Sequence, residues 1–324
     1  MQLRAGRGAD GAPPFCYALG ESFGIAMALW TRPSSTAALS DIEQLRAHFA
    51  ALFTRFGESP PGLEFSTGQL GPIPGEWTRH AKAVPGRVLL YFHGGGYIAG
   101  SPESHRALIG RLAEAGEASA FAVRYRLAPE CIYPAAVRDG IDAYRGLLAS
   151  GVDPSGVILA GDSSGGGLVF AVALAVRNAG LPMPAGLAAM SPWADLSLSG
   201  WSMLQNQKSD TALHWEILFQ CARHYLRKSN PSDAYASPAF ANLKEFPPIM
   251  VHAGAAEILR DDASKLGDRA ADAQTAVSVE IYDGMGHLFQ ADNRSNEAKV
   301  SLARLGQFIR SKTAAARQPE IQPI

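Results

Sequence analysis

Hydrophobic and polar residues follow two different periods along this chain, and the two periods predict strands and helices respectively. Short apolar runs bounded by Gly, Pro or polar residues predict strands near 63–67, 76–80, 87–92, 119–124, 157–161, 187–190, 249–252 and 277–282. Longer stretches with apolar residues three and four positions apart predict helices near 103–115, 134–149, 164–179, 261–273 and 293–311. Because strands and helices alternate, we expect an α/β fold with a mostly parallel central sheet flanked by helices.

Two further helical patterns lie outside this alternation. Before the first strand, a capping-box pair of Ser40 and Glu43 precedes apolar residues at helical spacing, which are Ile42, Leu45, Phe49, Leu52 and Phe56. The stretch 199–230 interrupts the alternation with a second apolar stripe, formed by Leu213, Ile217, Phe219 and Leu226. The two patterns predict a small helical cap over one end of the sheet.

The chain shows no internal repeat and no long linker, so we expect one catalytic core carrying this cap. The core is predicted at 61–198 and 231–324, the N-terminal cap helices within 1–60, and the second cap segment at 199–230. A chain of 324 residues is long enough to bury a sizeable core in such a domain.

Composition and charge narrow the class of partner. Hydrophobic residues make up 47% and charged residues 18% of the chain, and 29 basic against 30 acidic side chains give a net charge of −1. These values are ordinary for a globular protein and provide no electrostatic attraction for nucleic acid or an anionic membrane. The longest strongly apolar run, 165–176, is too short to span a bilayer. We expect a small neutral or weakly polar substrate, no nucleic-acid partner and no stable membrane insertion.

The cysteines indicate a reducing compartment. Cys16, Cys131 and Cys221 are odd in number and widely spaced, without the spacing of a metal site. The apolar stretch 23–30 follows Glu21 and lacks a cleavage-site pattern, so we expect no signal peptide. The sequence therefore predicts free thiols and a cytoplasmic location.

The strand predicted at 157–161 runs directly into the segment GDSSG at 161–165, which is followed by an apolar helix. A G-x-S-x-G pattern between a strand and a helix is typical of a nucleophile elbow, in which a strained turn presents a reactive serine. Gly161 and Gly165 leave the space that this turn needs. A phosphate-binding loop is not expected, because no G-K-[ST] follows. We predict Ser163 as the nucleophile.

A second glycine-rich turn, HGGGY at 93–97, follows another predicted strand. Consecutive glycines let backbone N–H groups approach a bound ester, and such donors stabilise the negative charge that develops on its carbonyl oxygen. We assign the N–H groups of Gly94, Gly95 and Ser164 to this oxyanion hole, and a structural role to His93.

The general base is expected after the serine, because the chain order that accompanies a nucleophile elbow is Ser, then Asp or Glu, then His. His287 lies in a glycine-containing loop after the strand predicted at 277–282, which distinguishes it from the other histidines. The acid, which holds the imidazole tautomer and stabilises the imidazolium, is expected after the preceding strand. Glu257 occupies that position. Asp261 and Asp262 are alternatives, or they cap the helix that follows.

Five segments together resemble a known family. They are HGGGY at 93–97, YRLAPE at 125–130, GDSSGG at 161–166, SPWADLSLSG at 191–200 and GMGH at 284–287. On these segments the chain resembles the bacterial hormone-sensitive-lipase-like esterases, which have the α/β-hydrolase fold and a helical cap. The resemblance implies a serine carboxylic-ester hydrolase that acts on short- to medium-chain acyl esters through an acyl-enzyme on Ser163. It also implies that no cofactor is needed, and it suggests a homodimer.

Three positions depart from the family pattern. Glu257 begins the triplet Glu-Ile-Leu where Asp-Pro-Leu is usual, Cys131 stands where a histidine is usual, and Ser164 stands where alanine is common. The first departure leaves open whether Glu257 or Asp261 is the acid. Some relatives are similar to acetyl-hydrolases and lactone hydrolases, so a lactone or acetyl-ester substrate is an alternative.

Aromatic side chains in and near the cap are candidates for the substrate pocket. We expect Tyr97, Trp215 and Phe219 to line it, although each would suit a core equally well.

Two functions other than ester hydrolysis are alternatives. A non-catalytic ligand-binding module resembles plant hormone receptors that have lost the catalytic histidine, whereas His287 is present here. An oxidoreductase could use the G-x-G-x-x-A pattern at 94–99 to bind a dinucleotide. In a dinucleotide-binding fold a helix would already run at Pro102, and the next strand would end in a carboxylate that binds the ribose. This chain has a proline at the first position and no carboxylate at the second, so this function is disfavoured.

Overall fold

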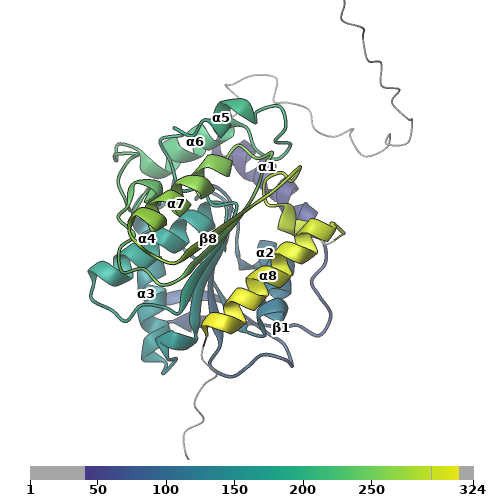
Figure 1. Cartoon of the computed structure of the whole chain (residues 1–324), viewed down its shortest axis with the longest axis vertical. Helices are drawn as coiled ribbons and strands as arrows, with labels where there is room; N and C mark the ends of the chain where they lie inside the picture. Colours follow the sequence, from purple (N-terminus) through teal and green to yellow (C-terminus); the bar gives the residue numbers. More distant parts are fainter. Residues whose placement is uncertain (1–40, 293, 314–324) are drawn as a thin grey trace, which may run out of the picture. The chain divides into compact units, whose positions relative to one another are not determined.

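An eight-stranded sheet crosses the part of the chain that the computed structural model describes, residues 41–292 and 294–313 (Figure 1). Its strands are β1 Glu64–Leu70, β2 Ile73–Arg79, β3 Val88–Phe92, β4 Ser119–Val123, β5 Val157–Asp162, β6 Gly186–Met190, β7 Ile249–Gly254 and β8 Val277–Tyr282. They are arranged in the order β1-β2-β4-β3-β5-β6-β7-β8. β2 is antiparallel to β1 and to β4, and all other neighbours are parallel. The predicted, mostly parallel sheet is confirmed.

Helices cover both faces of the sheet. α2 (Pro102–Gly116) and α8 (Asn296–Lys312) lie on one face, and α3 (Ala135–Ala149), α4 (Ser164–Asn178) and α7 (Arg260–Asp272) lie on the other (Figure 1). These are the five helices that the apolar spacing predicts. No helix in the described part of the chain is long and apolar enough to cross a membrane.

The central strands are apolar throughout because both of their faces are covered. Every residue of β3 is buried, and successive side chains alternate between the two faces. Leu89 and Tyr91 pack in the cluster that α2 and α8 complete, whereas Leu90 and Phe92 pack in the larger cluster with α3 and α4. This double burial explains why these strands appear in the sequence as continuous apolar runs.

Three helices lie over one end of the sheet (Figure 1). They are α1 (Ile42–Phe53), which continues into the 3₁₀ turn η2 (Thr54–Phe56), α5 (Ser202–Gln205) and α6 (Trp215–Leu226). α1 buries Leu45, Phe49 and Leu52, members of the predicted stripe.

The N-cap of α1 differs from the prediction. The side chain of Asp41 accepts a hydrogen bond from the Glu43 N–H at 2.9 Å and caps the helix. Ser40 and the rest of the predicted N-terminal cap before residue 41 lie outside the described residues.

The loops that carry the predicted chemistry follow the carboxyl ends of neighbouring strands. HGGGY follows β3, Ser163 follows β5, Glu257 follows β7 and His287 follows β8. Because the carboxyl ends of parallel strands meet at one edge of a sheet, the topology brings these loops together.

The central strand β5 provides a test of the core. Leu159 is fully buried and lies between Leu90 of β3 and Leu187 of β6. We expect Leu159→Ala to lower the free energy of unfolding by about 3 kcal/mol, because it removes buried methyl groups and leaves a cavity. Urea denaturation measures this change. Leu204→Ala, at a position that is 63% exposed in α5, should change the free energy by less than about 0.5 kcal/mol. Equal losses in the two variants would contradict the described core.

Candidate active site

Ser163 sits on a strained turn between β5 and α4. Its backbone has φ +52° and ψ −123°, a conformation that non-glycine residues rarely adopt. A Cβ atom at Gly161 would collide with the carbonyl oxygen of Gly165, and one at Gly165 would collide with that of Phe92. The two glycines of the G-x-S-x-G pattern are therefore required by close backbone contacts, and the turn holds the serine at the end of the strand.

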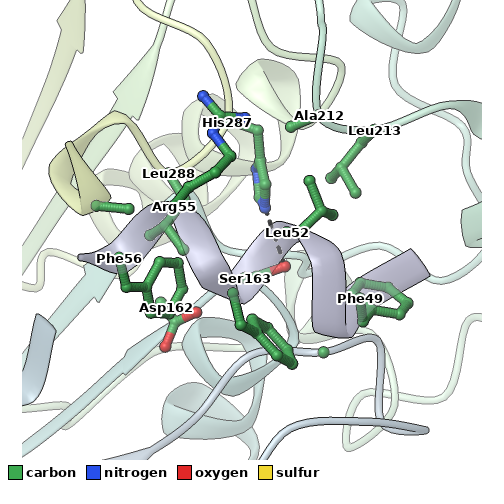
Figure 2. Close-up of a pocket in the computed structure, with 13 residues that line it drawn as sticks. Phe49, Leu52, Arg55, Phe56, Asp162, Ser163, Ala212, Leu213, His287 and Leu288 are labelled. Carbon is green, nitrogen blue, oxygen red and sulfur yellow. Dashed lines mark hydrogen bonds between the residues drawn. The ribbon is translucent and has the colours of Figure 1, made fainter. Parts of the chain in front are cut away.

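The imidazole of His287 faces this serine. Its Nε2 atom lies 3.1 Å from Ser163 Oγ, and Figure 2 shows the ring pointing at the hydroxyl. The backbone N–H of Leu288 donates to Ser191 Oγ at 3.0 Å, which anchors the histidine loop to the end of β6. At this distance Nε2 can accept the hydroxyl proton.

Of the three acids considered, the structure places Glu257 beside His287. Glu257 Oε2 lies 3.3 Å from His287 Nδ1, and the carboxylate is fully buried. Asp261 instead accepts the Ser202 N–H at 2.8 Å, and Asp262 accepts the N–H groups of Ala194 and Asp195. Neither aspartate caps its own helix, which was the other role predicted for them, because Asp261 faces the start of α5 (Ser202–Gln205) and Asp262 faces the loop after β6.

Burial and pairing act on the acid and the base in opposite directions. Burial raises the pKa of Glu257 above its usual range, and the contact with His287 offsets only part of this rise. Burial also lowers the pKa of His287, but the contact with Glu257 and the negative charge of that carboxylate outweigh burial, so the pKa is raised. The pair thus favours a proton on the imidazole once the serine has released it.

A carboxylate that the sequence analysis did not predict braces the acid loop. Asp210 is buried, and its Oδ2 atom accepts the Ile258 N–H at 2.9 Å, next to Glu257. Its Oδ1 atom accepts the N–H groups of Ala212 and Leu213 at 2.9 and 3.0 Å. The negative charge of Asp210 raises the pKa of both Glu257 and His287. In the sequence it carries only the signal of an ordinary Asp turn.

The structure corrects one of the predicted oxyanion donors. The N–H of Gly94 donates to Asp162 Oδ1 at 3.1 Å, so this donor is already engaged. By contrast, the N–H groups of Gly95, Gly96 and Ser164 have no hydrogen-bond acceptor within the described residues. Gly95, unlike Gly94, also lines the pocket that contains Ser163 and His287.

Asp162 is the centre of a buried network beneath this loop. Besides Gly94 it accepts the Tyr91 hydroxyl at 2.7 Å, and its Oδ2 atom lies 3.4 Å from His105 Nε2. Burial alone would raise the pKa of Asp162, but the interactions with His105 and Tyr91 outweigh it and lower the pKa. The carboxylate therefore stays charged and holds the glycine loop against β5.

His93 has the structural role that the sequence predicts. Its ring stacks on Tyr125 at a centroid distance of 4.3 Å, and Nδ1 lies 2.8 Å from the Gly94 carbonyl oxygen. Burial is the main cause that lowers the pKa of His93 to about 3, so the ring is neutral.

The pocket above the serine has a volume of about 420 Å³, including its open mouth. α1 and η2 form one wall, and Ala212, Leu213, Leu288 and Ala291 form much of the rest (Figure 2). The wall from α1 and η2 consists of Phe49, Leu52, Phe53, Arg55 and Phe56. Within the described residues no group of three or more His, Cys, Asp or Glu side chains could hold a metal ion.

The predicted aromatic lining is wrong for this pocket. Tyr97 is buried and stacks on Tyr225 at 4.0 Å, inside the core rather than along the cavity. Trp215 and Phe219 are 38% and 44% exposed and contact one another on the outer surface of α6. The aromatic wall comes from α1 instead, because the face of that helix with the predicted apolar stripe covers the serine.

A buried serine, an imidazole within hydrogen-bond distance and a buried acid behind it define a serine-hydrolase type of site. A family described as alpha/beta hydrolase fold matches residues 89–291. An acetyl-hydrolase of Streptomyces hygroscopicus is 40% identical over 255 residues, which are 78% of this chain and 84% of that protein. An esterase of Acinetobacter venetianus is 36% identical over 253 residues, with 78% and 83% covered.

Solved structures agree with these relatives. A crystal of the esterase EstE5 soaked with p-nitrophenyl butyrate has a TM-score of 0.82 and 35% identity, over 88% of this chain and 94% of that one. An esterase from the bacterial hormone-sensitive lipase family has a TM-score of 0.81 and 34% identity, over 86% and 97%. The chain therefore belongs to the α/β-hydrolase fold family and, within it, to the bacterial hormone-sensitive-lipase-like esterases.

The network at Asp162 provides a test of the glycine loop. The Gly94 N–H and the Tyr91 hydroxyl both donate to Oδ1 of Asp162, while its Oδ2 faces His105 Nε2. Asp162→Asn removes the buried charge and replaces one of these oxygens by an amide donor, so either the anchor of the glycine loop or the contact with His105 is lost. We expect kcat for ester hydrolysis to fall about tenfold or more, because a displaced loop weakens the oxyanion donors, whose complete loss typically costs about 10²–10³-fold each. Asp142→Asn, at an exposed ion pair with Arg145, is the control and should keep kcat. A folded Asp162→Asn variant with wild-type kcat would refute the anchoring role.

Proposed function

We propose that this protein is a carboxylesterase-type serine hydrolase in which Ser163 is the nucleophile, His287 the general base and Glu257 the acid of the triad. The observation that carries the proposal is the chain of contacts from Ser163 Oγ to His287 Nε2 at 3.1 Å, and from His287 Nδ1 to Glu257 Oε2 at 3.3 Å. No other acid among the described residues lies within 4.0 Å of the His287 ring nitrogens.

The reaction follows from the roles of these groups. His287 takes the proton of Ser163 as the hydroxyl oxygen attacks the ester carbonyl carbon, and the imidazolium then gives that proton to the departing alcohol. The resulting acyl-enzyme is hydrolysed when His287 removes a proton from water and returns it to Ser163 Oγ. Glu257 stabilises the imidazolium in both halves of the reaction.

The free amides of Gly95 and Ser164 are the proposed oxyanion donors, with Gly96 as the third in place of Gly94. Their support is that each N–H is unbonded within the described residues and that Gly95 lines the pocket beside Ser163. Ser164 is the first residue of α4, so its N–H points from a helix N-terminus, where partial positive charge favours an oxyanion.

Short acyl esters are the proposed substrates. Three phenylalanines and Leu52 on the α1 wall give the pocket an apolar side that suits a small acyl or alcohol group. The relative named an acetyl-hydrolase supports short acyl groups. Acetyl esters and lactones remain within this proposal. A cap formed by 1–60 and 199–230, a homodimer and a cytoplasmic location stay predictions.

A panel of p-nitrophenyl esters of rising acyl length tests the reaction. We expect wild-type activity to be highest for the shortest chains, and Ser163→Ala to lower kcat at least about 10⁴-fold, because the nucleophile is removed while the fold is kept. Release of p-nitrophenolate measures both effects. Wild-type protein without activity on any member of the panel would refute the proposed esterase.

The acid is tested by Glu257→Gln against Asp261→Asn. Glu257→Gln should lower kcat by about 10³–10⁴-fold, because the imidazolium loses its counter-charge. Asp261→Asn affects the contacts with the Ser202 N–H and the Arg260 side chain, neither of which involves His287, and should keep most of the activity. The reverse ranking of the two variants would assign the acid to Asp261.

The pH dependence of kcat/KM also tests the pairing of His287 with Glu257. His287 must be neutral to act, and its pKa is raised above 6.5, so wild-type kcat/KM should be full at alkaline pH and fall as the pH drops through that raised value. In Glu257→Gln the burial that lowers the pKa remains while the main raising interaction is lost, so the acidic limb should move to lower pH. Initial rates from about pH 5 to about pH 9 measure both limbs; an unmoved limb would contradict the pairing.

A further inference from the structure

One basic side chain, Arg55, interrupts the apolar wall of the pocket that contains Ser163. Arg55, on the 3₁₀ turn η2 that follows α1, lines the pocket together with Ser163 and His287. The side chain of Arg55 extends from η2 toward the side of the pocket that contains His287 (Figure 2). The neighbouring wall residues on α1 and η2 are apolar except for this guanidinium.

The guanidinium of Arg55 forms no ion pair or hydrogen bond with the part of the chain that the structure describes. The positive charge of Arg55 helps to lower the pKa of Asp292, whose carboxylate is held mainly by the Arg294 side chain at 3.0 and 3.2 Å. Asp162, which lines the pocket, is engaged by Tyr91 and Gly94. Neither acid forms an ion pair with Arg55.

Hydrogen bonds from a side chain of α2 anchor the pocket wall that contains Arg55. Arg111 of α2 donates to the carbonyl oxygen of Phe56 at 3.1 Å and to that of Ala291 at 3.0 Å. Both of these residues line the pocket, so one side chain ties the turn η2 to the opposite 3₁₀ turn, η5 (Phe289–Ala291). The backbone position of Arg55 at the pocket is held by this link.

We propose that Arg55 forms an anion subsite, and that the pocket prefers esters with a carboxylate on the end that does not react. The inference rests on the proposed esterase function and names its substrate class. A guanidinium binds a carboxylate through two parallel hydrogen bonds, and Arg55 is exposed, so an anion can reach it from solvent. The carboxylate of Asp162 lines the pocket next to Ser163 and repels an anion there, so the charge arrangement directs the substrate's anionic end to Arg55 and its ester to the serine.

Two matched substrate pairs test the subsite, because the carboxylate can lie on either side of the ester. Mono-4-nitrophenyl adipate against 4-nitrophenyl hexanoate places it on the acyl chain. 4-Acetoxybenzoate against its methyl ester places it on the leaving group. For each pair the measured quantity is the ratio of kcat/KM for the charged ester to that for the neutral one. Comparing this ratio between variants cancels the intrinsic reactivity of each ester.

We expect Arg55→Gln to lower the ratio about three- to fivefold in at least one pair, the upper size expected for an ion pair that stays exposed to solvent. Arg55→Lys keeps the charge and should keep part of the preference. Arg79→Gln, at an exposed position on β2 that does not line the pocket, removes the same charge and should leave activity and ratio unchanged.

The outcomes separate this inference from the proposed function. A ratio that Arg55→Gln does not change in either pair overturns the subsite while wild-type hydrolysis of the neutral esters leaves the esterase standing. An equal fall in Arg79→Gln also overturns it, because the preference would then come from net charge rather than from the pocket. Failure of wild type on the neutral esters instead refutes the proposed function itself.

Discussion

The site depends on one tight reversal of the chain, the turn at Ser163 between β5 and α4. Its positive φ is tolerated because the neighbouring glycines, Gly161 and Gly165, let the backbone pass against itself and against the end of β3. The parallel pairing of β5 with β3 and β6 holds this turn at the edge where the other loops end. The glycine loop after β3 and the histidine loop after β8 then reach the same hydroxyl without any further adjustment of the sheet.

Buried charge is the second constraint on this site, and it concerns two carboxylates. Glu257 is buried at a cost that its contact with His287 partly offsets, and the same contact makes the imidazole a stronger base. Asp162 is buried beneath the glycine loop and is kept ionised by His105 and Tyr91. One carboxylate thus contacts the imidazole directly, and the other positions the glycine loop beside Ser163.

The errors of the sequence analysis have a common physical origin. Gly94 is a good candidate donor in a glycine-rich turn, but Asp162, on a different strand, already accepts its N–H. Trp215 and Phe219 are aromatic and lie in the predicted cap, yet α6 turns them outward. Tyr97 belongs to the expected loop and is stacked in the core. Each error concerns which way a correctly placed segment faces, which depends on the segments packed against it.

Local pattern is sufficient to predict the eight strands, the five covering helices and the serine turn, because apolar periods and glycine-flanked turns act over a few residues. Chain order also points to Glu257 and His287, but it leaves Asp261 as a rival only four positions from Glu257. Packing in three dimensions separates the two acids, since one faces His287 and the other the Ser202 N–H. The free amides, the aromatic wall from α1 and the unpaired cation at Arg55 likewise emerge only on folding, because each is a relation between segments far apart in the chain.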